Sequence, residues 1–167
     1  MAKWRVVCLL VVMALGGCGS GQPDPLSADA KAVEPKLRSF YSHSYAGLDV
    51  DDDRLVVYRK PDAALDAFVR DHVKDADIES RDAPFSLDEL QSLTERVTGD
   101  RHYWSTRQFT VTLVAPRADG TGVNVVVATE DLKAAQEAFR QRYGNEPVIV
   151  HLPARTGIVP VRRYPPA

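Results

Sequence analysis

Apolar and polar positions change their spacing several times between Val33 and Leu152, and each change predicts one element. Apolar residues three and four apart predict helices, and strict alternation predicts strands with one buried face. The predicted order is hairpin, helix, strand, helix, hairpin, helix, strand. The ranges are a short helix at 35–41, strands at 46–50 and 54–59, a helix opened by Pro61, a strand at 78–81, a helix at 86–99, strands at 106–115 and 123–127, a helix at 130–143 and a strand at 147–152.

The helix over 86–99 has the clearest end signals. Ser86-Leu87-Asp88-Glu89 fits a capping box, Phe85 with Leu90 fits a hydrophobic staple, and Gly99 supplies a stop. Its expected buried residues are Leu87, Leu90, Leu93 and Val97. In the helix opened by Pro61, the positions that follow the spacing of an apolar helix face are Ala64, Leu65, Phe68, Val69, His72 and Val73. In the second hairpin, one face is expected to carry Phe109, Val111 and Leu113, followed by Val123, Val125 and Val127.

Two segments of the chain resemble each other at an offset of 71 residues (134 − 63). Ala63-Ala64-Leu65-Asp66-Ala67-Phe68 and Ala134-Ala135-Gln136-Glu137-Ala138-Phe139 each follow a hairpin and precede a strand, and the same offset sets Ile78 against Ile149. Duplication of a hairpin–helix–strand unit explains this similarity, and so does the general likeness of alanine-rich helices. Either way, the predicted fold class is α+β, an antiparallel sheet with helices packed on one face, in a single domain over 33–154.

The chain begins with a short charged and apolar segment that ends in a cysteine. Lys3 and Arg5 precede an apolar run over 6–15, and this run is shorter than the roughly 20 residues that cross a bilayer. Leu15-Gly16-Gly17-Cys18 follows and resembles the lipobox of bacterial lipoproteins. The resemblance implies that residues 1–17 are a cleaved signal peptide and that Cys18 carries a lipid. An ordinary signal peptide, or an uncleaved anchor with an incidental cysteine, is the alternative.

Composition places the flanks of the domain outside its core. The chain has two cysteines, Cys8 and Cys18, so cleavage after Gly17 would leave Cys18 without a partner for an intrachain disulfide. Residues 18–32 are rich in Gly and Pro and are expected to form the lipidated N-terminus and a flexible tether. Residues 155–167 are expected to form an extended tail with Arg155, Arg162 and Arg163. Cleavage would move the formal net charge from −2 to −2 − 2 = −4, which argues against a nucleic-acid partner.

Few residues in the chain point to catalysis or metal binding. The acidic run Asp49-Val50-Asp51-Asp52-Asp53 has Arg54 and Lys60 where a calcium loop would need Gly and Glu, so a solvated turn is expected. His43, His72, His102 and His151 are not spaced as metal ligands. No nucleophile or phosphate-loop motif is present. We therefore expect no enzyme, no metal, and no cofactor other than the covalent lipid on Cys18.

One aromatic cluster is a candidate contact for a partner or ligand. His102, Tyr103 and Trp104 stand between a helix stop and a strand, and Trp and Tyr dominate many binding surfaces. A large aromatic residue that fills the end of a small core is the alternative for Trp104. A deep pocket at this cluster would favour a small ligand, and an exposed sheet face would favour a protein partner.

Short segments carry two further resemblances. Tyr45-Ala46-Gly47-Leu48, Leu55-Val56-Val57, Phe85-Ser86-x-x-Glu89-Leu90 and Gly120-x-Gly122-Val123 resemble small lipoproteins of actinobacteria that have no assigned activity. More distantly, the order of elements is similar to the pro-regions of secreted chymotrypsin-like serine proteases, in which duplicated α+β units fold and inhibit a protease. No protease domain follows in this chain, and a pro-region has no catalytic residue to carry over.

Together these features predict a non-catalytic binding or interaction module, anchored by lipid to the cell membrane and facing outside the cytoplasm. Its expected partners are the membrane and a secreted or envelope protein. A protease chaperone or inhibitor acting in trans, or a sensor of small ligands or of the envelope, is the alternative function.

Overall fold

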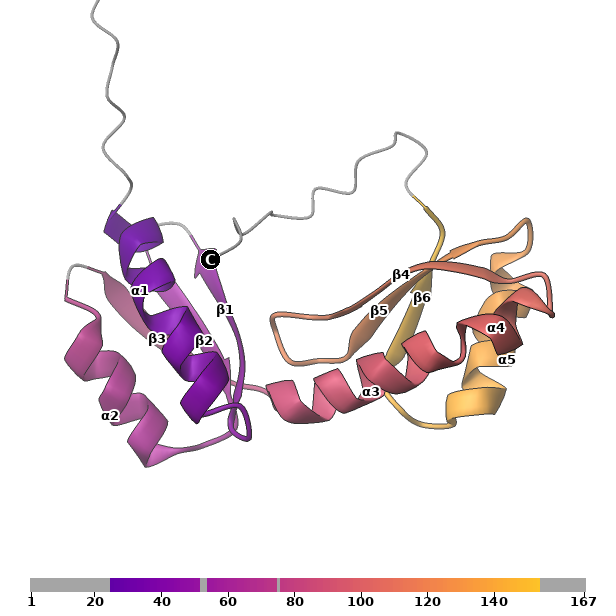
Figure 1. The fold of residues 1–167 in the computed structure, drawn as a ribbon. Coiled ribbons are helices and arrows are strands. Elements are labelled where there is room, and N and C mark those ends of the chain that lie inside the picture. The colour runs from indigo at the N-terminus through magenta and orange to yellow at the C-terminus, as the bar shows by residue number, and fades with distance from the viewer. Residues whose placement is uncertain (1–24, 52–53, 75, 154–167) are drawn as a thin grey trace, which may run out of the picture.

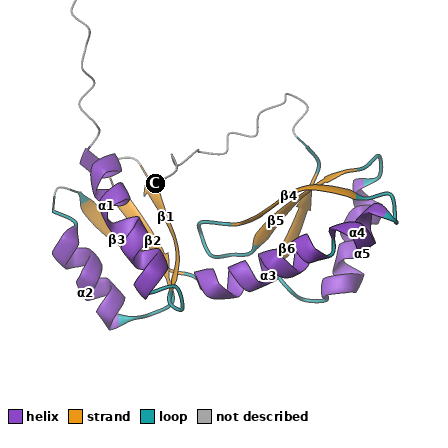
Figure 2. Cartoon of the chain, in the orientation of Figure 1, coloured by secondary structure: helices purple, strands orange, loops and turns teal. Residues whose placement is uncertain are grey.

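The computed structural model describes residues 25–51, 54–74 and 76–153 (Figure 1). The elements are α1 (Pro25–Phe40), β1 (Tyr45–Asp51), β2 (Arg54–Arg59), α2 (Ala63–His72), β3 (Asp77–Asp82), α3 (Leu87–Gly99), α4 (Arg101–Ser105), β4 (Thr110–Pro116), β5 (Val123–Ala128), α5 (Leu132–Tyr143) and β6 (Val148–His151). Helices and strands are interspersed along the chain, and no single sheet contains all of the strands (Figure 2). The predicted α+β class is confirmed.

The strands form two sheets of three, in the orders β1-β2-β3 and β4-β5-β6. In each sheet the first two strands are antiparallel, and the third is parallel to the second. The structure therefore repeats a hairpin–helix–strand unit, as predicted: we call 25–82 the first unit and 87–151 the second. The prediction of one antiparallel sheet is wrong. The helix between the hairpin and the third strand returns the chain to the end of the sheet where the second strand began, so the third strand runs parallel to the second.

The shared fold does not follow the sequence similarity from which duplication was predicted. In α2 the buried residues are Leu65 and Val69, with Val73 one turn on, whereas in α5 they are Ala135, Phe139 and Tyr143. These sets correspond at an offset of 70 residues (135 − 65), one fewer than the repeated letters suggest. At an offset of 71, buried Leu65 would match exposed Gln136. The alanine-rich segments therefore resemble each other at an offset that differs by one residue from the offset of the buried positions.

Each unit has its own apolar core under its helices. The first core contains Ala30, Val33 and Leu37 of α1, Leu55 and Val57 of β2, and Leu65 and Val69 of α2. The second contains Leu90, Leu93 and Val97 of α3 with Val123, Val125 and Val127 of β5, as predicted. Leu87 is the exception in α3, because it packs in the first core. Helix α3 thus joins the two units (Figure 1).

Helix α1 begins earlier than the sequence suggested. It starts at Pro25, so the predicted tether over 18–32 and domain start at Val33 are wrong for residues 25–32. Ala30 already lies in the first core, at 4% exposure. Proline at the first helical position lacks only an N–H that would have no helical partner, and the alanines that follow favour helix. Pro35 stands inside the helix on its exposed side.

The segment before the second hairpin also differs from its prediction. Residues 101–105 form the short helix α4, and β4 begins only at Thr110. The register of β4 on β5 shifts between Val111 and Leu113. As a result Phe109, Val111 and Val114 pack on the second core, and Leu113 does not. A β-bulge breaks the simple alternation from which Leu113 was assigned to the core face.

The two units meet at what we call the junction, where the β4–β5 loop lies on β1. A Cβ added at Gly47 would lie 2.2 Å from the Ala118 carbonyl oxygen, and one at Gly120 would lie 2.8 Å from the Ala46 Cβ. The Phe85 N–H donates to the Gly120 carbonyl at 3.2 Å. Three of the four segments that carried the lipoprotein resemblance therefore supply residues to this junction.

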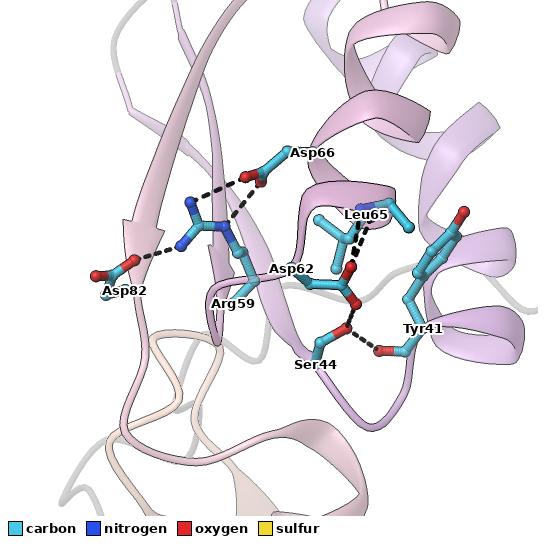
Figure 3. A network of polar contacts seen from close by, with 8 residues as sticks. Tyr41, Ser44, Arg59, Asp62, Leu65, Asp66 and Asp82 are labelled. Atoms are coloured by element: carbon cyan, nitrogen blue, oxygen red, sulfur yellow. Dashed lines mark hydrogen bonds and ion pairs between the residues drawn. The ribbon is translucent and has the colours of Figure 1, made fainter.

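Buried polar contacts fix the start of β1 against α2 in the first unit (Figure 3). Asp62 caps α2 by accepting from the Ala64 and Leu65 N–H groups at 2.9 and 3.2 Å. The buried Ser44 hydroxyl donates to Asp62 at 2.6 Å. This hydrogen bond, with the two from the backbone, lowers the pKa of the Asp62 carboxyl. Nearby, Arg59 pairs with both Asp66 and Asp82.

Candidate interaction surfaces

The predicted aromatic cluster lies on α4, and its three residues have different environments. Trp104 is fully buried, and its ring stacks on Phe139 with centroids 3.9 Å apart. Its indole N–H donates to the Tyr143 hydroxyl at 3.1 Å. Trp104 therefore fills the end of the second core, and in this structure it offers no contact to a partner. His102 is exposed, and Tyr103 is half-buried.

A polar network closes the core below Trp104. Asp100 accepts from Arg142 at 3.0 and 3.1 Å and from the Tyr143 hydroxyl at 2.9 Å. The hydrogen bond from Arg142 lowers the pKa of the Asp100 carboxyl, and burial raises the pKa of Tyr143 to about 12. Each of these polar groups has a hydrogen-bond partner within the network, so the network stabilises the fold.

Tyr103 is engaged by cations of its own chain. The guanidinium carbon of Arg107 lies 3.7 Å from the Tyr103 ring centroid, and that of Arg142 lies 4.2 Å from it. Such contacts are attractive because the ring face is electron-rich. A ligand that stacks on Tyr103 would have to compete with these side chains. Of the three predicted contact residues, His102 is therefore the most accessible.

A groove of about 580 Å³ runs between α5 and β6. Lys133, Gln136 and Arg140 line it on α5, with Phe139 and Tyr143 deeper. Val148, Ile149 and Val150 line the opposite wall on β6. Acidic Glu137 and Glu146 also line it, so the lining of the groove carries charges of both signs. Its size and mixed lining suit an extended chain or a small molecule of low net charge.

The β6 wall is the edge of the second sheet. The Val123 N–H donates to the Pro147 carbonyl at 2.8 Å, and Val123 pairs with Val148. In a parallel ladder alternate residues bond to the neighbouring strand, so Val148 and Val150 direct their backbone groups to the open edge. Gln136 Nε2 donates to the Val150 carbonyl at 3.3 Å. The Val148 carbonyl and the Val150 N–H thus face the groove side of the edge.

The sequence did not predict this groove. The sequence predicts only a helix over 130–143 and a strand over 147–152. An edge is a property of strand order, which hydrophobic spacing does not encode.

The described residues offer little for metal binding or acid–base catalysis. Within them, no three His, Cys, Asp or Glu side chains gather in a group that could hold a metal ion. Asp49 and Asp51 of the acidic run lie at the end of β1, and Asp52 and Asp53 lie outside the described residues. Carboxyl groups with shifted pKa values, such as Asp62 and Asp119, have them lowered by hydrogen bonds to donors. A general acid would need the opposite shift.

Cys18 and the tail over 155–167 also lie outside the described residues. None of the helices in the described part of the chain is long and apolar enough to cross a membrane. No family model, curated protein or solved structure matches this chain. The resemblances to lipoproteins and to protease pro-regions therefore stay predictions.

Proposed function

We propose that this protein is a lipid-anchored, extracytoplasmic binding module without catalytic activity. Cys18 carries the lipid, and the second unit binds an extended segment of a secreted or envelope protein along β6. The observation that carries the binding proposal is the open edge of β6 beside the α5 groove.

Edge strands bind extended peptides through backbone hydrogen bonds, and an adjacent groove selects the side chains. At β6, the Val148 carbonyl and Val150 N–H supply an acceptor and a donor on one edge. Phe139 and Tyr143 give the groove an apolar floor, and Lys133 and Arg140 give it a polar rim. An extended segment with alternating apolar and polar residues would fit both.

A non-catalytic role is supported by how the ionisable groups are used. Asp62 caps a helix, Asp100 joins a closed network, and Asp119 is bound by Arg117 within one loop. None of these three carboxylates lines the groove. Binding through backbone edges and apolar contacts needs no ionisable group with an unusual pKa.

The test is position-specific photo-cross-linking of the acylated protein in its native membranes. A photoreactive amino acid replaces Lys133 in the groove, and the matched control replaces Gln91, an exposed residue of α3. Mass spectrometry identifies the cross-linked partner peptide and the modification on the Cys18 peptide. The expected result is one partner segment linked from position 133 and absent from position 91. A second substitution, Gln136→Trp, fills the groove and is expected to abolish this cross-link.

Other results would change the proposal in distinct ways. A partner linked equally from positions 133 and 91, or a cross-link unaffected by Gln136→Trp, would contradict groove binding. A cross-link from position 133 to residues 154–167 of the same chain would show that the groove serves an intramolecular contact. A secreted protease as the partner would favour the role of a chaperone or inhibitor in trans. An unmodified Cys18 peptide would contradict the anchor.

A further inference from the structure

The position of α1 relative to Cys18 limits how far the first unit can stand from a membrane. Pro25 is seven positions after Cys18 (25 − 18), and a fully extended chain over seven such steps spans at most about 25 Å. Helix α1 has 16 residues and is therefore about 24 Å long. If Cys18 carries the lipid, the helices of the first unit are within reach of the bilayer surface.

Aromatic side chains lie on both α1 and α2, and Lys36 of α1 reaches towards α2. Phe40 is 71% exposed, and the other exposed large hydrophobic side chain in the described residues, Leu152, is 44% exposed. Lys36 stands one helical turn before Phe40, with Nζ 5.9 Å from the centroid of the Phe68 ring. Phe68 in turn stacks on His72, with centroids 4.1 Å apart. We call Lys36, Phe40, Phe68 and His72 the α1–α2 patch.

The fully exposed charges on α1 and α2 are mainly positive, although the whole chain is acidic. Among described residues of 28–40 and 63–74, the exposed charged side chains are Lys31, Lys36, Arg38, Arg70, Lys74 and, as the single exposed acid, Asp71, while Asp29 is half-buried. Asp66 of α2 is partly buried and pairs with Arg59, and Glu34 is 9% exposed and pairs with Arg38. The first unit therefore presents cations and a bare aromatic ring on the same helices.

From these observations we infer that the α1–α2 patch docks on the surface of an anionic phospholipid bilayer and orients the anchored protein. This inference rests on the proposed lipid anchor. An exposed aromatic ring enters the interface between headgroups and acyl chains, and cations beside it bind lipid phosphates. Lys36 has its ammonium group beside the Phe68 ring, and a lysine can keep that group in water while its stem lies on an apolar surface. The lipid supplies the attachment, and the patch supplies the orientation.

The experiment measures the depth of a fluorophore on the acylated protein, reconstituted in vesicles that contain a nitroxide-labelled phospholipid. Ser39→Cys places a dye on exposed α1 beside Phe40, and Thr98→Cys places it on exposed α3 as the matched control. Cys18 is blocked by its lipid, so the introduced thiol is the one that reacts. Vesicles of phosphatidylglycerol are compared with vesicles of phosphatidylcholine.

The expected result is strong quenching at position 39 in phosphatidylglycerol, weak quenching at position 98, and loss of quenching at 39 in phosphatidylcholine. Lys36→Glu is expected to lower the ratio of docked to undocked protein more than about fivefold, since each cation near an anionic surface contributes about that factor. Two results would overturn docking and leave the anchor intact, provided that the protein still floats with the vesicles. One is equal quenching at positions 39 and 98, and the other is no quenching at position 39. Quenching at 39 that is the same in both lipids would overturn the role of the cations. If the Cys18 peptide recovered from cells carries no lipid, the anchor and the docking are both overturned.

Discussion

Gly47→Ala places a methyl group where the structure leaves no room for one. The new Cβ would lie 2.2 Å from the Ala118 carbonyl oxygen and 2.7 Å from the Ala118 Cα. Both are backbone atoms, so no side-chain rotation relieves the contact. The β4–β5 loop would have to move away from β1, which would loosen the junction between the units.

Alanine substitutions at four glycines can distinguish this steric effect from backbone strain. Gly47 has the contact without a positive φ, Gly144 has φ +65 with nothing within 4 Å, and Gly120 has both φ +68 and a contact at 2.5 Å. Gly99, at the end of α3, has neither. We expect Gly47→Ala to lower the free energy of unfolding by about 1–3 kcal/mol. Gly144→Ala is expected to cost about 1–3 kcal/mol, because φ +65 with ψ −125 is a conformation that residues with a Cβ rarely adopt. Gly120→Ala combines both effects, for about 2–5 kcal/mol, and Gly99→Ala is expected to be neutral or stabilising by less than about 1 kcal/mol.

The assay is urea denaturation followed by circular dichroism and by tryptophan fluorescence. The sequence has two tryptophans, Trp4 and Trp104, so a chain that starts at Cys18 reports on the second core through Trp104 alone. Circular dichroism reports on both units. For Gly47→Ala we also expect the two probes to separate, since a looser junction uncouples the units. A cost for Gly47→Ala no larger than that for Gly99→Ala would refute the close approach of the loop to β1.

Three further predictions concern single polar groups. Tyr143→Phe removes the acceptor of the buried Trp104 N–H and is expected to cost about 1–3 kcal/mol in urea denaturation; an unchanged midpoint would contradict that hydrogen bond. Ser44→Ala removes the 2.6 Å donor to Asp62 and is expected to cost about 1–2 kcal/mol, more than Ser42→Ala, which removes a 3.0 Å donor to exposed Asp88. Arg117 holds the pKa of Asp119 at about 2, below its ordinary 3.8, so this group stabilises the fold above about pH 4 and loses that effect as the pH falls towards 2. Asp119→Asn is expected to cost about 1 kcal/mol at neutral pH, after screening by solvent, and to flatten the acid limb of the stability profile; a profile identical to that of the unaltered protein would contradict the ion pair.

Local signals in the sequence predicted the elements that depend on neighbours along the chain. Ser86 and Glu89 form the predicted capping box, because both partners lie within one turn of helix. Gly144, at the end of α5, has a φ of +65, a value that glycine adopts without the steric cost of a Cβ. The hydrophobic spacing of α3 and β5 was predicted for the same reason, since one face of each is buried along its length.

Features that depend on distant residues could not be predicted in this way. Leu113 leaves the core face because β4 bulges against β5, and nothing in the alternation of 106–115 marks the bulge. Helix α1 forms at Pro25 because Ala30 and Val33 find a core to pack in, although its local composition suggested a tether. The groove at β6 follows from strand order. The burial of Trp104 follows from Phe139 and Tyr143, more than thirty positions along the chain.

The two proposed surfaces can be separated by experiment because they share no residue. The α1–α2 patch belongs to the first unit and the α5–β6 groove to the second, and the units are joined by α3 and the junction. Lys36→Glu is therefore expected to weaken quenching at position 39 and to leave the cross-link from position 133 intact in membranes. Gln136→Trp should have the opposite effect. Loss of both signals with either substitution would show that membrane docking and partner binding are one event, and the groove would then be a surface that the bilayer itself helps to form.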